Sequence, residues 1–96
     1  MVEKSAQALA DAMSEQMISL KALEEMAELS EILLKSLTKR EAMRPPIAKV
    51  IEEGGDVLYR LKVLFKSLDI EKQIEKRVQE KAEIMNRWLK EQKPEY

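Results

Sequence analysis

The feature that most constrains the fold of this chain is a long stretch without helix breakers. From about Glu3 to about Lys39 the sequence contains neither glycine nor proline and is rich in Ala, Leu, Met, Glu and Lys, which all favour helix. Pro45 and Pro46 then stop any helix, because proline lacks the backbone N–H and restricts the residue before it. The sequence therefore predicts an all-α chain whose main loop lies at about residues 40–46.

Two further helices are predicted after this loop. The first should begin near Pro46 or Ile47, since proline suits a first turn, and should extend to about residue 66. The second has Asp69 as its expected N-terminal cap, runs to about residue 91 and should end before Pro94. Both segments show the apolar periodicity of amphipathic helices.

The N-terminal part leaves an alternative open. Residues 3–19 either continue the first long helix or form a separate arm that is broken near Ser14 or Ser19. We expect a single domain over residues 1–96, with its core at about 16–90, a helical arm at 1–15 and a tail at 91–96.

Each predicted helix carries an apolar stripe, which is typical of a helix that packs against a core. A chain of 96 residues buries only a modest fraction of its surface, so self-association is expected. The predicted core stripes are Leu20, Leu23, Met26, Ala27, Leu33, Leu34 and Leu37; Val50, Ile51, Val57, Leu58, Leu61, Leu64 and Phe65; and Ile70, Ile74, Val78, Ala82, Met85, Trp88 and Leu89.

Composition excludes several classes of function. Seventeen basic residues oppose 18 acidic ones, so there is no basic field to bind nucleic acid. No run approaches the roughly 18 apolar residues that span a bilayer, so no membrane role is expected. Cysteine is absent, which excludes disulfides and thiolate sites, and the N-terminus lacks the apolar run of a secretory signal. We expect a cytoplasmic protein.

Histidine is absent as well. Di-iron bundles with Glu-x-x-His pairs, most zinc hydrolases, and serine or cysteine triads all need imidazole. Carboxylate, lysine, arginine and tyrosine remain, and this set favours a metal-activated water as the nucleophile.

Two acidic pairs are the strongest indication of chemistry. Glu25 and Glu28, and likewise Glu53 and Asp56, are three positions apart, so each pair should share one helical face. If the two helices lie side by side, four carboxylates converge, and such charge is costly unless a cation neutralises it. Hard oxygen ligands suit Mg²⁺, with Mn²⁺ as an alternative. The competing interpretation is solvated surface, because the chain is 36% charged.

Gly54 and Gly55 stand inside the second helix, between Glu53 and Asp56. Two mid-helix glycines cost about 1 kcal/mol each relative to alanine, so something nearby should need the space. Gly54 lies on the apolar side, where it would permit tight helix packing. Gly55 lies away from that side, where it could leave room for a ligand.

Two basic side chains are possible phosphate ligands. Arg60 follows Asp56 by four positions and could either pair with Asp56 or contact a phosphate. Lys81 lies at the margin of the last apolar stripe, between Val78 and Trp88. It could contact a substrate phosphate, or it could simply cover the core with its aliphatic stem.

The two acidic motifs, LEEMAEL at 23–29 and IEEGGDVLY at 51–59, resemble the Glu-x-x-Glu and Glu-x-x-Asp signature of the MazG-type all-α nucleoside triphosphate pyrophosphohydrolases. The likeness covers about residues 16–89. It implies a homodimer or homotetramer whose hairpin protomers form a four-helix core, and cleavage of a (deoxy)nucleoside triphosphate to monophosphate and pyrophosphate. It also implies a lysine in the last helix, matched by Lys81, and Mg²⁺ bound by Glu25, Glu28, Glu53 and Asp56.

The chain departs from this family pattern, also in lacking the family's longer N-terminal and loop elements that shape the base pocket, and two other functions remain open. Some members have an asparagine four residues after the lysine, where this chain has Met85. Residues 56–59 also resemble phosphoribosyl-ATP pyrophosphohydrolase, although Arg60 replaces the histidine expected after the tyrosine. A non-catalytic helical interaction module is the third possibility.

The mechanism expected for the hydrolase is attack of a metal-polarised water on the α-phosphorus, with pyrophosphate as the leaving group. One of the glutamates should orient this water. Glu25 and Glu24 are the candidates for this catalytic role, and Glu52 is a further possible base.

Overall fold

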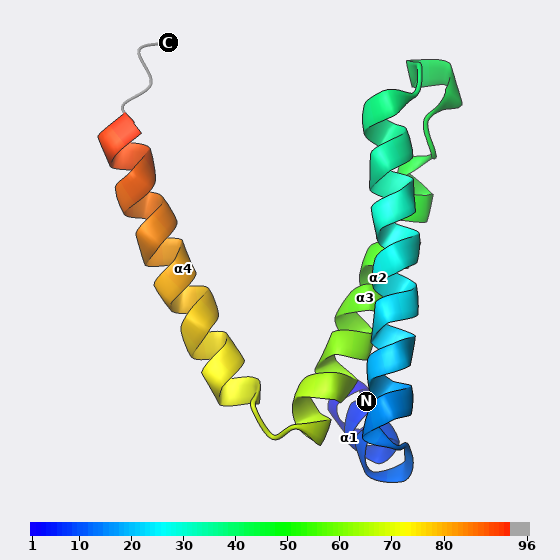
Figure 1. Ribbon diagram of the computed structural model, residues 1–96, viewed down its shortest axis with the longest axis vertical. Coiled ribbons are helices and arrows are strands. Elements are labelled where there is room, and N and C mark those ends of the chain that lie inside the picture. Colours follow the sequence, from blue (N-terminus) through cyan, green and yellow to red (C-terminus); the bar gives the residue numbers. More distant parts are fainter. Residues whose placement is uncertain (93–96) are drawn as a thin grey trace.

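Helices are the only regular secondary structure in the part of the chain that the structure describes (Figure 1). The computed structural model describes residues 1–92, and no strand occurs among them. None of the described helices is both long and apolar enough to cross a bilayer. The all-α prediction is therefore confirmed. The elements are α1 (Val2–Ala12), α2 (Glu15–Thr38), a short 3₁₀ turn η1 (Glu41–Met43), α3 (Ile47–Ser67) and α4 (Glu71–Gln92).

Ser14 separates the N-terminal arm from the first long helix. Its hydroxyl accepts a hydrogen bond from the backbone N–H of Met17 at 3.2 Å, which satisfies one of the unpaired donors of the first turn. Met13 and Ser14 both have extended backbone angles. Of the two predicted break points, Ser14 is therefore correct, and α1 is a separate helix that folds back against α3.

The two connections between the long helices differ in how well they were predicted. The loop from α2 to α3 lies where the prolines indicate, and Pro46 precedes the first residue of α3. The cap predicted at Asp69 is wrong: Asp69 has a φ of 54° in the turn after α3, and the first bond of α4 joins the N–H of Ile74 to the carbonyl of Ile70. Pro94 lies outside the described residues.

The helices α2 and α3 form an antiparallel hairpin, and α1 lies across one end of it (Figure 1). The apolar core sits at this end, where Ala6 from α1, Ile18 from α2 and Val63 from α3 are almost completely buried. Leu9, Met13, Tyr59 and Leu64 pack around these three residues. The core is small, and every one of its elements comes from the first 67 residues.

The core stripe predicted for α2 is wrong, because these residues do not face the core of their own chain. All seven of its residues are exposed, Leu34 among them. The opposite face packs against α3, where Ile18 and Ala22 are buried and Leu29 and Ile32 are half-buried. The reason is that α2 is apolar over most of its circumference, and α3 occupies the face that also carries Glu25.

The stripes predicted for α3 and α4 are only partly correct. Val57 is buried and faces inward, but Ile51 and Leu58 are exposed. No residue of α4 is buried, because this helix diverges from the hairpin and meets α3 only near the turn that joins them (Figure 1). The radius of gyration is 17.1 Å, whereas a compact domain of this length has about 12 to 13 Å.

The two glycines of α3 do not serve packing inside one chain. A Cβ atom built on Gly54 or on Gly55 would meet no other atom within 4 Å. The tight helix packing predicted at Gly54 therefore does not occur inside the single chain, and both positions adjoin open space.

Candidate metal centre

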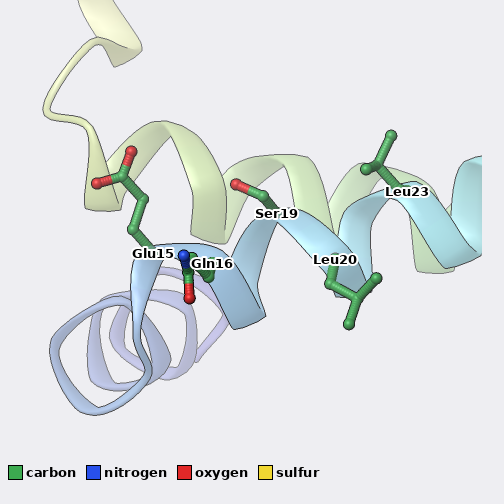
Figure 2. A pocket seen from close by; sticks show the side chains of 5 residues that line it. All are labelled: Glu15, Gln16, Ser19, Leu20 and Leu23. Carbon is green, nitrogen blue, oxygen red and sulfur yellow. The ribbon is translucent and has the colours of Figure 1, made fainter.

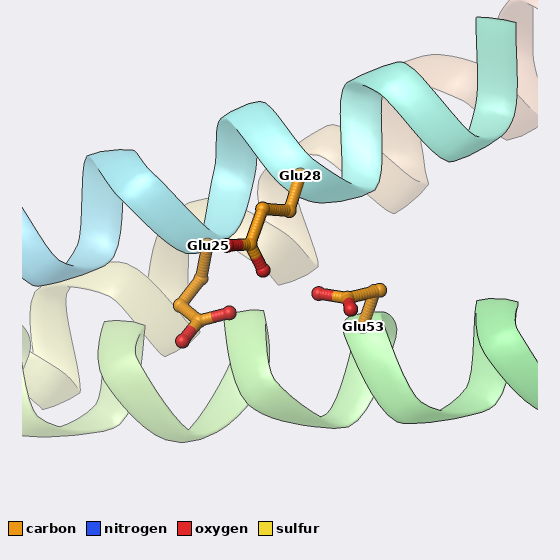
Figure 3. A group of neighbouring side chains, drawn as sticks. All are labelled: Glu25, Glu28 and Glu53. Carbon is orange, nitrogen blue, oxygen red and sulfur yellow. The ribbon is translucent and has the colours of Figure 1, made fainter.

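Glu53 is the most unusual side chain of the hairpin, because it is charged and yet only 5% exposed. It projects from α3 toward α2 (Figure 3). Its Oε1 lies 3.2 Å from the Nζ of Lys49, one turn earlier on the same helix. Its Oε2 is buried and has no hydrogen-bond partner. A buried, unpaired carboxylate oxygen costs free energy, so this position suits a cation or a proton.

Two glutamates of α2 point at the same place. Glu25 and Glu28 project from α2 toward α3 (Figure 3), and a carboxylate oxygen from each lies within 4.8 Å of the others and of Glu53. The Oε2 of Glu25 is also buried without a partner. The three-residue spacing therefore did bring both side chains onto the face that meets α3.

The crowding of these carboxylates changes their affinity for protons. A hydrogen bond with Glu53 raises the pKa of Glu28 above its ordinary value, and repulsion by the negative charges of Glu53 and Glu25 raises it further. The cause is that like charges at this distance cannot all ionise without cost. A divalent cation would remove the same repulsion by taking the place of the proton.

Asp56 joins this group through Glu53. Oxygens of Glu52, Glu53 and Asp56 form a second set that lies within 4.8 Å of one another. The four predicted ligands are therefore brought together as two overlapping sets that share Glu53. Asp56 and Glu52 are both exposed, so the second set faces solvent while the first lies between the helices.

Glu24 and Lys81 are not brought to this group within one chain, and Arg60 forms no ion pair with it among the described residues. Glu24 is exposed and pairs with Lys21 at 3.4 Å, apart from both carboxylate sets. Arg60 is half-buried on α3, and within residues 1–92 it makes no ion pair with Asp56. Lys81 is exposed on α4, beside Ile74 and Val78, on the helix that leaves the hairpin.

Two lysines that the sequence analysis missed adjoin the buried carboxylates. Lys35 and Lys49 line a hollow of about 270 Å³ between the helices, together with Glu28, Glu31, Ile32 and Glu53. Hydrogen bonds to Glu53 and Glu52 raise the pKa of Lys49, so it stays positively charged. Their positions in the sequence could have identified them, because Lys35 lies two turns after Glu28 and Lys49 lies one turn before Glu53. Each lysine therefore shares a helical face with its glutamate.

A larger hollow elsewhere on the hairpin lacks this chemistry. About 440 Å³ of space lies along the outer side of α2, lined by Glu15, Gln16, Ser19, Leu20 and Leu23. All five side chains come from this single helix (Figure 2). With one carboxylate, this hollow offers no set of ligands for a cation.

No protein-family model, curated protein or solved structure matches this chain. What this centre can bind is therefore inferred from its own side chains. Carboxylate oxygens can hold a hard divalent cation, and the ammonium groups of Lys35 and Lys49 beside them can attract phosphate.

Proposed function

We propose that this protein is a Mg²⁺-dependent hydrolase that cleaves (deoxy)nucleoside triphosphates to the monophosphate and pyrophosphate, with a house-cleaning role in the nucleotide pool. The observation that carries this proposal is the buried Oε2 of Glu53, which has no partner and lies among the carboxylates of Glu25 and Glu28. The resemblance of the two acidic motifs to MazG-type enzymes supports the class of substrate.

The groups present fit Mg²⁺ or Mn²⁺ better than softer metals. Every ligand is a carboxylate, and the chain has neither cysteine nor histidine. Glu25, Glu28 and Glu53 would hold the cation between the helices, and Asp56 would extend the site toward solvent. Bound Mg²⁺ would supply positive charge to the phosphates and lower the pKa of a coordinated water.

The protein's own side chains would orient the substrate. Lys35 and Lys49 line the hollow beside the carboxylates and would attract the phosphate oxygens that the cation leaves free. Arg60 follows Asp56 by one turn and is a further phosphate ligand. Glu52, which lies with Glu53 and Asp56, is better placed than Glu24 to accept a proton from the attacking water.

Lys81 can reach a carboxylate centre only if the assembly brings it there, because α4 leads away from the centre of its own chain (Figure 1). We therefore propose that the active form is a homodimer or homotetramer. In that form Lys81 of one copy would contact the phosphates bound by another.

The proposal is tested by incubating the purified protein with a panel of ribo- and deoxynucleoside triphosphates and Mg²⁺ and measuring pyrophosphate. Glu28→Gln and Asp56→Asn should each lower the release by at least about 100-fold, since each removes a charged ligand. Their circular dichroism should stay helical. Glu15→Gln, an exposed change on the same helix as Glu28, is the matched control and should leave activity unchanged.

The same assay separates the alternatives. Hydrolysis of phosphoribosyl-ATP without hydrolysis of any nucleoside triphosphate would replace the proposed substrate. Failure to hydrolyse either, together with a melting temperature that ignores Mg²⁺ and Mn²⁺, would leave a helical interaction module. The many exposed apolar side chains of α2 and α4 favour the helical interaction module as the second candidate function.

A further inference from the structure

Lys49 supplies the positive charge that the carboxylates of the metal centre meet in their own chain. Its Nζ lies 3.2 Å from Oε1 of Glu53 and 3.3 Å from Oε2 of Glu52. Among residues 1–92, no other lysine or arginine forms an ion pair with a carboxylate of the centre. A single ammonium group therefore serves all the carboxylates of the two sets, which are Glu25, Glu28, Glu52, Glu53 and Asp56.

This neutralisation is incomplete. Glu53 is only 5% exposed and projects toward α2 (Figure 3), and Lys49 pairs with just one of its two oxygens. The Oε2 atoms of Glu53 and Glu25 are buried without a partner. A single positive charge at the edge of the group leaves a repulsion that a divalent cation among the carboxylates would remove. Lys49 therefore sits on the carboxylate that both sets share without satisfying it.

The position of Lys49 on α3 is unfavourable for the helix itself. The lysine lies in the first turn, since α3 begins at Ile47, and that turn has no acidic residue. The partial positive charge at the N-terminus of a helix favours acidic side chains and disfavours cations. Lys49 is therefore stabilised by Glu52 and Glu53, which lie about one turn later, and not by the end of the helix.

The side chain of Lys49 has space to turn away from these carboxylates. It is 44% exposed and lines the hollow of about 270 Å³ between α2 and α3. The backbone is fixed, because the N–H of Lys49 donates a hydrogen bond of 2.9 Å to the carbonyl of Pro46. A lysine carries its charge on a flexible stem of four carbons. The ammonium group can therefore move into the hollow without any change in α3.

Lys35, which lines the same hollow from α2, has a different partner. Its Nζ lies 3.0 Å from Oε1 of Glu31, and Glu31 belongs to neither carboxylate set. Both side chains of this pair are largely exposed, so the pair is a weak one in water. The two lysines of the hollow therefore differ, because only Lys49 is bound to the carboxylates that would hold a cation.

We propose that Lys49 is an exchangeable counter-cation of this centre. Its ammonium group holds Glu53 in the metal-free protein, gives up this carboxylate when a divalent cation binds, and then turns into the hollow to contact a phosphate group of the substrate. The first step rests on the metal centre alone and does not depend on hydrolysis. The second step rests also on the proposed function, because it needs a substrate that carries phosphate.

Titration of the metal-free protein with Mn²⁺, followed through the electron paramagnetic resonance signal of the free ion, tests the first step without any substrate. Lys49→Met should lower the dissociation constant for Mn²⁺ at least about 5-fold, because the metal ion then displaces no ammonium group. Lys49→Arg keeps the charge and should bind no more tightly than the wild type. Lys35→Met is the matched control and should change the constant less than about 2-fold, because water and salt screen its exposed charge.

Two outcomes of this titration would contradict the proposal. Equal or weaker Mn²⁺ binding by Lys49→Met, beside a wild type that binds Mn²⁺, would overturn the competition and leave the proposed hydrolase in place. A wild type that binds no Mn²⁺ would remove the metal centre, and both the exchange and the proposed function with it. Circular dichroism should show the same helix content in every variant.

Binding of inorganic triphosphate to the Mg²⁺-saturated protein, measured by calorimetry, tests the second step. This probe carries the phosphates that all nucleoside triphosphates share, so the result does not depend on the base. Lys49→Met should weaken its binding at least about 10-fold, although the same variant holds the metal ion more tightly. Lys49→Arg should recover most of the affinity. A lysine with a purely structural role would not change the two affinities in opposite directions, and unchanged triphosphate binding in Lys49→Met would overturn the transfer to phosphate.

Discussion

The two ends of the contact between α2 and α3 are built in opposite ways. At the end covered by α1, Ile18 and Val63 meet Ala6 in a buried apolar core. Farther along the same pair of helices, Glu25 and Glu28 face Glu53, and two buried oxygens have no partner. One end therefore supplies stability, and the other accepts a cost in stability, as binding sites do.

Loss of packing at the apolar end should have the largest effect on stability. Ile18→Ala should lower the free energy of unfolding by about 2 to 4 kcal/mol, because it leaves a cavity in a core that has few other residues. Leu34→Ala, at an exposed position of the same helix, should cost less than about 1 kcal/mol. Urea denaturation followed by circular dichroism measures both, and equal losses would show that no such core exists.

The opposite end should respond with the opposite sign. Glu53→Met removes the buried carboxylate and should raise the free energy of unfolding of the metal-free protein by about 1 to 3 kcal/mol. Lys49 loses a partner but remains half-exposed to water. The stabilisation by Mg²⁺ should disappear in the same variant. A metal-free protein that becomes less stable would contradict the cost assigned to this end.

The response to Mg²⁺ should depend on pH through Glu28. Because the pKa of Glu28 is raised by Glu53 and Glu25, its contribution to stability without metal is full below the ordinary value of 4.5 and is lost as pH rises through the raised pKa. Mg²⁺ competes with that proton, so the shift in melting temperature caused by Mg²⁺ should grow over the same range. Melting curves with and without Mg²⁺ across pH measure this effect. Glu28→Gln should flatten the dependence, and an equal response in both proteins would contradict the assignment.

The smallest effect is expected at the attachment of α1 to the apolar end. Hydrogen bonds from Lys62 and Lys66 lower the pKa of Glu3 to about 2, so its contribution to stability is present above the ordinary value and is lost as pH falls toward about 2. Glu3→Gln should lower the melting temperature only slightly at neutral pH, because the Glu3 side chain is itself exposed and water weakens its ion pairs with the two lysines. The difference from the wild type should vanish in acid, and a difference that persists there would have another cause.

The sequence was sufficient to predict the helices and the convergence of the acidic pairs. Proline positions and the hydroxyl of Ser14 determine where helices begin or end, and a spacing of three places Glu25 and Glu28 on one face. The inward face of α2 could not be predicted, because Leu29 and Ile32 on one side are as apolar as Leu33 and Leu34 on the other. The direction of α4 depends on the backbone angles at Asp69 and could not be predicted from the sequence. For this reason Lys81 was not expected to lie away from the carboxylates of its own chain.

The short turn around Asp69 is the joint about which α4 would rotate as one rigid body. The 22 residues of α4 correspond to a rigid rod of about 33 Å, so a rotation of about 10° in the turn would move the far end by about 6 Å. Trp88 sits near that far end, and a change of one residue's backbone angles would carry it across a distance comparable to the width of a side chain. Small changes in the backbone angles of this turn would therefore determine how close the end of α4 comes to a neighbouring molecule.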